Sequence, residues 1–126
     1  MIEEGKALFL QIAESVEDSI VDGSLPEQTQ APSTNELAAF YRINPATAAK
    51  GVTMLVDKGV LYKRRGIGMF VAPGARESLL AERRAAFRER YLTPLLAEAR
   101  KLGLGTEDLA QLLREHAQTT TTEGTQ

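Results

Sequence analysis

Thr47 and Lys50 are the residues whose types and spacing best suit chemistry in this chain. A hydroxyl and an ammonium group donate hydrogen bonds to phosphate oxygens and to base edges, as a protein surface that reads DNA requires. They follow Ala46 near the start of a predicted helix, and its small side chain lets the backbone come close to a base edge. We interpret Thr47 and Lys50 as the main candidate contacts.

The helix that carries these residues is predicted to begin at Asn44 and to end before Gly59. Asn44 is a good N-cap, and Pro45 suits the first helical position because its missing amide proton would have no partner there. Glycine is typical of the residue that follows a helix. Four apolar residues with helical spacing are predicted to face the core, namely Ala48, Val52, Leu55 and Val56. The face shared by Ala46, Thr47, Lys50 and Met54 is predicted to point outward.

A shorter helix is predicted just before it, starting after Ser33. The Ser33 side chain and Glu36, three residues later, form the pattern of a capping box. Leu37, Ala38 and Tyr41 would give this helix one apolar stripe. Because only about three residues separate the two helices, the pattern predicts a helix-turn-helix.

A basic hairpin is predicted from Val60 to Val71. The first strand would hold residues 61–63, the turn residues 65–68 and the return strand residues 69–71. Lys63, Arg64 and Arg65 are expected at its tip, where Gly66 and Gly68 would permit close approach to a sugar-phosphate backbone or a minor groove. This pattern is typical of a wing.

The motifs PSTNELA, INPATAAKG and LVDKGVLYKRRGIGMFV, with the earlier LFLQIAESVEDSIVDGSL, resemble the GntR family of bacterial transcription regulators over residues 7–73. The NPAT run and a C-terminal part of about fifty residues are similar to the short YtrA-like branch. The resemblance implies a winged helix-turn-helix, a homodimer, and control of nearby genes, often those of transporters. Its DNA contacts carry over onto Ser33, Thr34, Asn44, Ala46, Thr47, Lys50, Arg65, Gly66 and Gly68.

Two features depart from the family pattern. Asn35 stands where the family usually has an arginine, so it can hydrogen-bond to DNA but carries no charge. Ala48, Ala49 and Gly51 stand where larger aliphatic residues are usual, and a glycine inside a helix costs about 1 kcal/mol relative to alanine.

Charge is segregated along the chain. The net charge of −2 counts against DNA binding, because nucleic-acid modules are commonly basic. Residues 42–65, however, hold one acid, Asp57, and six cations, namely Arg42, Lys50, Lys58, Lys63, Arg64 and Arg65, while residues 3–36 hold eight acids and only Lys6. This segment predicts a local phosphate-binding surface that includes Arg42 and Arg64. The alternative is a solvated charged surface.

An N-terminal helix should support this unit. Phe9, Ile12, Ala13, Val16 and Ile20 recur with helical spacing before Gly23, and they are predicted to pack on the helix-turn-helix and the hairpin. Residues 23–32 are interpreted as a polar connector.

The C-terminal part is predicted to be a helical hairpin. One long helix should cover residues 76–102 with a kink at Pro94, and a second should start at Thr106 as its cap. Two helices cannot close a core of their own, so we expect the hairpin to pair with its copy in a homodimer. The expected dimerisation residues are Leu80, Phe87, Tyr91, Leu95, Leu96, Leu102, Leu109, Leu112 and Leu113. The alternative is that the hairpin folds back on its own winged domain.

Three regions are therefore expected: a winged helix-turn-helix over residues 1–74, a dimerisation region over 75–117 and a disordered polar tail over 118–126. The fold class is mainly α with a small β-hairpin.

Other classes of function find little support. The chain has no cysteine for disulfides or thiolate metal sites, and its one histidine, His116, has no acidic or cysteine cluster around it. No P-loop, GxSxG, HExxH or dinucleotide-binding motif is present, and the acid pairs Glu3-Glu4, Glu17-Asp18 and Glu107-Asp108 are expected to be solvated or helix-terminal charges. No run is apolar enough for a membrane helix, and the N-terminus lacks the order of a signal peptide. We expect no enzyme activity, cofactor or metal, and a cytoplasmic location.

The sequence thus favours a sequence-specific regulator that binds double-stranded DNA as a homodimeric repressor on an inverted-repeat operator. The alternative is a winged-helix module that binds proteins without specific DNA binding. Whether a small-molecule effector acts on it is left open.

Overall fold

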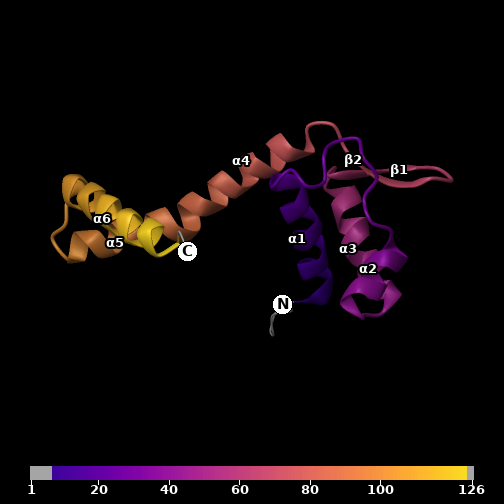
Figure 1. Cartoon of the computed structure of the whole chain (residues 1–126), viewed down its shortest axis with the longest axis horizontal. Coiled ribbons are helices and arrows are strands. Elements are labelled where there is room, and N and C mark those ends of the chain that lie inside the picture. The colour runs from indigo at the N-terminus through magenta and orange to yellow at the C-terminus, as the bar shows by residue number, and fades with distance from the viewer. Residues whose placement is uncertain (1–6, 125–126) are drawn as a thin grey trace. The chain divides into compact units, whose positions relative to one another are not determined.

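The chain forms two compact units. The computed structural model describes residues 7–124 (Figure 1). The units divide after Glu82. The sequence had placed this boundary after Gly74. It lies later because Ala75 and Leu79, in the first two turns of the next helix, are buried in the core of the first unit.

The first unit contains three helices and a two-stranded hairpin, and it ends within a fourth helix. The elements are α1 (Leu8–Val21), α2 (Thr34–Tyr41), α3 (Pro45–Asp57), β1 (Leu61–Arg64), β2 (Gly68–Val71) and the start of α4 (Ala75–Phe87). This order confirms the predicted mainly helical fold with a small antiparallel hairpin.

Local hydrogen bonds set the starts of α2 and α3 as the sequence predicts. Ser33 Oγ accepts from the Glu36 amide at 3.0 Å, and the Ser33 amide donates to Glu36 Oε1 at 2.8 Å, which completes the capping box. Asn44 Oδ1 accepts from the Ala46 amide at 2.7 Å. Between the helices Arg42 adopts a left-handed backbone with φ of 57°, and the Ile43 amide bonds to the Ala38 carbonyl at 3.0 Å. That bond closes α2 and reverses the chain toward α3.

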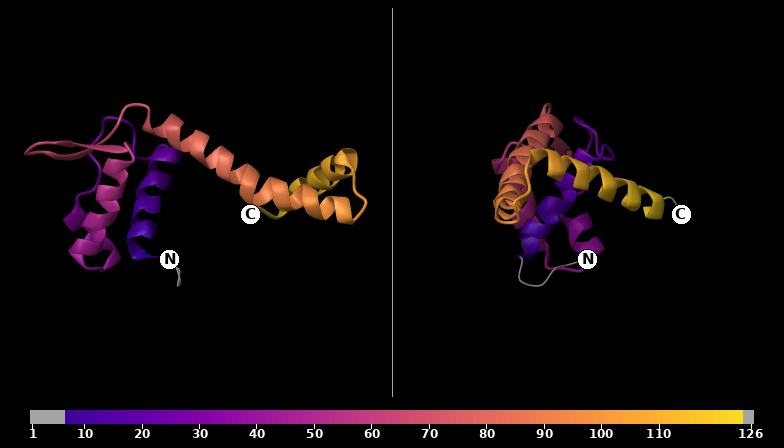
Figure 2. Two further views of the ribbon diagram at one scale, coloured as in Figure 1. Left: turned by 180° about the vertical axis from the view of Figure 1, so that it is seen from behind. Right: turned by 90° about the vertical axis from the view of Figure 1, so that its left-hand side faces the viewer.

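The core lies between α1 and α3, which run side by side (Figure 2). Its members include Ile12, Ala13, Val16 and Ile20 from α1, Leu37 and Ala38 from α2, Ala48, Val52 and Leu55 from α3, and Val60, Leu61 and Val71 from the hairpin region. The predicted core faces are therefore confirmed. Met54 is an exception, because it was expected on the outward face and instead packs partly on this core.

Gly51 explains the run of small residues in α3. A Cβ atom at this position would lie 2.8 Å from the carbonyl oxygen of Phe9, a backbone atom of α1. Side chains larger than hydrogen would hold the two helices apart. The cost of a glycine within the helix is therefore offset by a close crossing of α1 and α3.

The hairpin is supported along one edge by the segment that was expected to be a connector. β1 and β2 pair antiparallel, with Leu61 opposite Val71 and Arg64 opposite Gly68. The backbone of residues 28–31 pairs with β2: the Ala31 amide donates to the Met69 carbonyl at 2.8 Å, and the Val71 amide donates to the Thr29 carbonyl at 3.0 Å. These bonds tie the base of the wing to the helical core.

The second unit continues α4 into a helical hairpin. A π-helical segment, η1 (Arg88–Leu92), precedes α5 (Thr93–Lys101), and α6 (Thr106–Gly124) follows. The Thr93 amide bonds to the Arg88 carbonyl, one residue further back than in an α-helix. This π-helical turn interrupts the regular α-helix just before Pro94, where the sequence predicts a kink, and Pro94 itself lies in the first turn of α5, where its missing amide proton leaves no α-helical hydrogen bond unmade.

Helix α6 differs from its prediction at both ends. It begins at Thr106, so the residue that precedes the helix is Gly105 and not Thr106, which the sequence predicts as the cap. Asp108 Oδ2 accepts a hydrogen bond from the Gly105 amide at 2.9 Å. It continues through Gly124, although a disordered tail was predicted from Gln118. The Thr119 hydroxyl donates to the Glu115 carbonyl at 3.1 Å, so this polar side chain finds its hydrogen-bond acceptor on the backbone of its own helix. Residues 125–126 lie outside the described residues.

Replacing Gly51 by alanine tests the close crossing of α1 and α3, because the crossing determines whether the free energy of unfolding rises or falls. Helix propensity alone would raise the free energy of unfolding by about 1 kcal/mol. Because the added methyl group meets the Phe9 backbone, we expect the free energy of unfolding to fall by about 1 to 2 kcal/mol. Chemical denaturation measures this, and a Gly51→Ala protein more stable than the wild type would contradict the crossing.

Candidate nucleic-acid interface

The outward side of α3 presents the predicted contact residues near its N-terminus. Ala46 and Lys50 are exposed, and Thr47 is half-buried. Thr53, one turn beyond Lys50, is also exposed, and it was not among the predicted contacts. The signal was available, because residues 46, 50 and 53 share one face by helical spacing. This face carries hydroxyl and ammonium donors and no bulky side chain.

Lys50 is held in place by an aromatic ring. Its Nζ lies 4.2 Å from the centre of the Phe9 ring on α1. Such a cation–π contact at an exposed site contributes about 0.5 to 1 kcal/mol. Lys50 therefore has a defined position beside the α1–α3 crossing. Phe9 holds Lys50 in that position and also extends the apolar stripe of α1.

The starts of α2 and α3 place further donors on the first unit. Ser33, Asn35 and Asn44 are exposed, and Thr34 is half-buried. Ser33 and Asn44 use their oxygens as acceptors for the helix amides, so the hydroxyl proton and the amide protons stay available to a ligand. Both side chains sit at helix N-termini, whose partial positive charge favours phosphate. Arg42, in the turn between the helices, is exposed.

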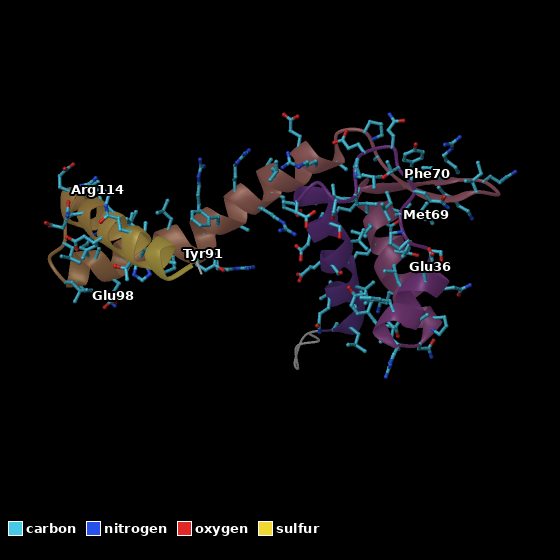
Figure 3. All side chains as sticks on the ribbon, viewed as in Figure 1. Glu36, Met69, Phe70, Tyr91, Glu98 and Arg114 are labelled. Atoms are coloured by element: carbon cyan, nitrogen blue, oxygen red, sulfur yellow. The ribbon has the colours of Figure 1, made fainter. Side chains whose placement is uncertain are left out.

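The cations of the wing do not all lie at its tip. Arg65 is in the turn, where the Ile67 amide donates to the Arg64 carbonyl at 2.9 Å. Lys63 and Arg64 belong to β1, and adjacent strand residues point to opposite faces. Arg64 lies over the Phe70 ring of β2, 4.7 Å from its centre. Figure 3 labels Phe70 on this hairpin. The tip therefore carries one of the three cations, and the other two flank the strands.

Gly66 and Gly68 have different structural roles. Gly66 is in the turn with φ of 78°. Gly68 has φ of 142°, and a Cβ atom there would lie 2.6 Å from Nε2 of Gln30. That amide donates to the Ile67 carbonyl at 3.0 Å. The close approach at Gly68 is therefore made by the Gln30 side chain, which anchors the return strand of the wing.

Lys58, which the sequence counts among the cations of the basic surface, is exposed, but two carboxylates engage its ammonium group. Its Nζ lies 2.7 Å from Oε2 of Glu17 and 2.8 Å from Oε1 of Glu82. Glu17 is only 7 % exposed, so the prediction that it is a solvated or helix-terminal charge is wrong. Because 41 residues separate Glu17 from Lys58, no local pattern could have revealed this pair.

Other chemistry has little basis in the described residues. A groove of about 820 Å³ lies beside α1 and α2, where Ser15 and Tyr41 hydrogen-bond through their hydroxyls. Within the part of the chain that the structure describes, no three His, Asp or Glu side chains are grouped so that they could hold a metal ion. Among the described helices, none has the length and apolarity needed to cross a membrane.

Comparison with known proteins gives the family. The model of bacterial regulatory proteins of the gntR family matches residues 8–71, about half of the chain. This chain belongs to the GntR family. The match covers α1 through β2, which are the elements that carry the predicted contact residues.

Individual relatives extend the likeness into the second unit. The transcriptional repressor YtrA of Bacillus subtilis is 25 % identical over 108 residues, which cover 86 % of this chain and 82 % of that protein. A GntR-family regulator from Bacteroides thetaiotaomicron superposes with a TM-score of 0.75 at 29 % identity, covering 90 % of this chain and 99 % of that one. The DNA-binding domain of AraR, solved in complex with the operator ORX1, has a TM-score of 0.51 at 26 % identity, covering 57 % of this chain and 93 % of that one.

These likenesses support the YtrA-like branch of the family, because the similarity to YtrA spans most of both chains. The chain is a DNA-binding transcriptional regulator of the GntR family. YtrA and the Bacteroides protein are both named as regulators, not as enzymes.

Replacing Gln30 by alanine tests the support of the wing. The loss of one hydrogen bond to the Ile67 carbonyl should raise the population of open wing conformations by about two- to tenfold. Amide hydrogen exchange should therefore quicken in residues 65–68 and stay unchanged in α1 and α3. Unchanged exchange in the wing would show that Gln30 does not anchor it.

Proposed function

We propose that this chain is a homodimeric repressor that reads an inverted-repeat operator through α3 and the β1–β2 wing. The observation that carries the proposal is the exposed N-terminal half of α3, with small and donor side chains, in the same unit as a basic hairpin. A helix of this kind fits the major groove, and the hairpin fits the adjacent sugar-phosphate backbone or minor groove.

The proposed contacts divide into two kinds. Thr47 and Lys50 are the candidates for base edges or nearby phosphates, with Ala46 allowing close approach. Phosphate-binding and positioning contacts are proposed for the remaining residues, namely Ser33, Thr34, Asn35, Arg42, Asn44, Arg64, Arg65, Gly66 and Gly68. Phosphate contacts set the affinity and its dependence on salt, whereas base contacts set the sequence preference. The AraR domain, a related fold that was solved in complex with an operator, supports a DNA-contacting role for the first unit.

A second copy of the chain is the proposed partner of the second unit. Over residues 83–120 Ala99 is the one buried residue. Large apolar side chains are exposed there, including Phe87 at 58 % and Tyr91 at 57 %, with Leu92, Leu95, Leu96, Leu102, Leu112 and Leu113. Leu109 is half-buried, and Leu80, also half-buried, lies in the first unit. A helical hairpin without a core of its own is stabilised when the same apolar face of a copy covers it.

Repression is the proposed outcome of binding, because a protein that occupies the groove near a promoter blocks polymerase without further chemistry. The name of YtrA, a transcriptional repressor, supports this direction. Acting on genomic DNA, the protein would work in the bacterial cytoplasm, without a catalytic step. Any small-molecule effector is unknown.

Removing single cations tests the interface. We expect Arg65→Ala and Lys50→Ala each to weaken operator binding about tenfold or more, as losses of charged hydrogen bonds do. Each should also lower the slope of log affinity against log salt by about one. Arg65→Ala should leave the free energy of unfolding unchanged, whereas Lys50→Ala should lower it by up to about 1 kcal/mol because the Phe9 contact is lost.

Mobility shifts on a duplex chosen by selection from random sequences measure the affinity, and Lys101→Ala in the second unit is the matched control for loss of a cation. Equal affinity of the wild type for the selected duplex and for a scrambled duplex would contradict sequence-specific regulation.

Introducing a charged side chain on the apolar face of the second unit tests whether two copies pair through that face. We expect Leu95→Glu to convert a dimer into a monomer in sedimentation velocity, because burying an unpaired carboxylate in an apolar contact is costly. Ala97→Glu introduces the same side chain at an exposed position that helical spacing puts on the other side of α5, so it should remain a dimer. A monomeric wild type would favour a hairpin covered within its own chain.

A further inference from the structure

One ammonium group joins three helices of the first unit. Lys58 follows the last residue of α3, and its Nζ contacts Glu17 of α1 at 2.7 Å and Glu82 of α4 at 2.8 Å. The side chain of Glu82 is 54 % exposed, whereas Glu17 is buried. Lys58 therefore ties the end of the proposed recognition helix to the second turn of α4.

The first turn of α4 is held by separate contacts. The Glu27 carboxylate accepts the Gly74 amide at 2.9 Å and the Arg76 amide at 3.2 Å. Nε of Arg76 donates to the Val21 carbonyl, at the end of α1, at 2.9 Å. We call the contacts made by Lys58, Glu27 and Arg76 the α4 clasp.

Apolar burial fixes the same two turns. Ala75 and Leu79, four residues apart on one face of α4, are buried in the core of the first unit. Polar contacts of the clasp surround this apolar contact. Residues 75–82 therefore belong to the winged-helix unit, and within that unit the first two turns of α4 have a defined position relative to α3.

The clasp stays charged under ordinary conditions. Partial burial lowers the pKa of Lys58, but the hydrogen bonds and negative charges of Glu17 and Glu82 more than offset this and hold the pKa above its usual value. The ammonium group is thus protonated at any pH up to its usual pKa near 10.5, and it loses its charge as the pH rises beyond the raised pKa. A change of pH around neutrality leaves the charge of Lys58 unchanged.

We propose that Lys58 and Glu82 determine which spacing between operator half-sites the regulator accepts. The proposal rests on the dimeric DNA binding proposed above. If two copies join through residues beyond Glu82, each recognition helix reaches its half-site through α4, so freedom at the base of α4 becomes freedom in the distance between the two recognition helices. Each added base pair moves a half-site by about 3.4 Å and turns it by about a tenth of a helical turn. A firmly held α4 accepts few such changes.

These two residues are positioning residues and do not themselves contact DNA. Nζ of Lys58 is engaged by two carboxylates, and Glu82 carries the charge that phosphate repels. Their loss should therefore alter the choice of spacing and leave the affinity for one half-site unchanged. A residue with a merely structural role would change both together, through loss of folded protein.

The experiment measures the affinity of the full chain for duplexes that differ only in spacer length. Two copies of a half-site, chosen by selection from random duplexes, are placed as an inverted repeat with spacers that span one helical turn, about 10 base pairs. A duplex with a single half-site gives the reference affinity. The variants are Glu82→Gln, which keeps Lys58 charged, and Lys58→Met. The matched control is Glu77→Gln, which removes the same charge from an exposed residue of α4 outside the clasp.

We expect the wild type and Glu77→Gln to bind one spacing about tenfold or more tightly than spacings one or two base pairs away, because DNA resists the twist or bend that would compensate. In Glu82→Gln this preference should fall severalfold while the single half-site affinity stays the same. Lys58→Met should reduce the preference for one spacer length at least as much. If the Lys58→Met protein fails to fold, the result for Glu82→Gln alone tests the inference.

The inference is overturned if Glu82→Gln keeps the spacing preference of the wild type, or if the wild type binds a single half-site well and shows no spacing preference. Binding of neither the single nor the paired half-site by the wild type is a different result. It would refute the proposed DNA-binding function, and the inference about spacing would fall with it.

Discussion

The close crossing of α1 and α3 at Gly51 is the constraint on which the rest of the first unit depends. Without a side chain at Gly51, the backbone of α1 approaches α3 to contact distance, and Ile12, Val52 and Leu55 close the core around that point. One side of α3 is thereby covered, while Ala46 and Lys50 stay exposed on the other. The same crossing brings Phe9 under the Lys50 ammonium and Glu17 beside Lys58. Contacts on both sides of this crossing, at Lys50 and at Lys58, thus orient α3, the proposed recognition helix, against α1.

Charge in this protein has two separate uses. The acids of α1 and of the segment after it help to hold the unit together, as Glu17 contacts Lys58 and Glu27 accepts the amides at the start of α4. The cations Lys63 and Arg65 stay exposed on the wing, and Arg42 is exposed in the turn between α2 and α3. This division explains how a chain of net charge −2 leaves cations exposed on the wing and in the α2–α3 turn, since acids such as Glu17 and Glu27 are engaged in contacts within the first unit.

The features that could be predicted from the sequence are those set by neighbouring residues. The capping box at Ser33, the Asn44-Pro45 start of α3 and the antiparallel wing follow from side chains within a few residues of each other. The missed features join distant residues: Gln30 anchors Ile67, Glu17 contacts Lys58, and Ala75 and Leu79 extend the first unit beyond Gly74. Gly51 was visible as an anomaly, but its reason lies in the backbone of another helix. Long-range contacts of this kind depend on packing, which no local pattern encodes.

The central claim is that α3 and the wing form one continuous surface that touches DNA. Titration of the isotopically labelled full chain with its selected operator, followed by the backbone amide signals in NMR spectra, tests it most directly. The account predicts the largest shifts at residues 46–50 and 64–66, with small shifts on the outer side of α1 around Glu14 and Asp18. Shifts concentrated beside the α1–α2 groove, with α3 and the wing unperturbed, would contradict it.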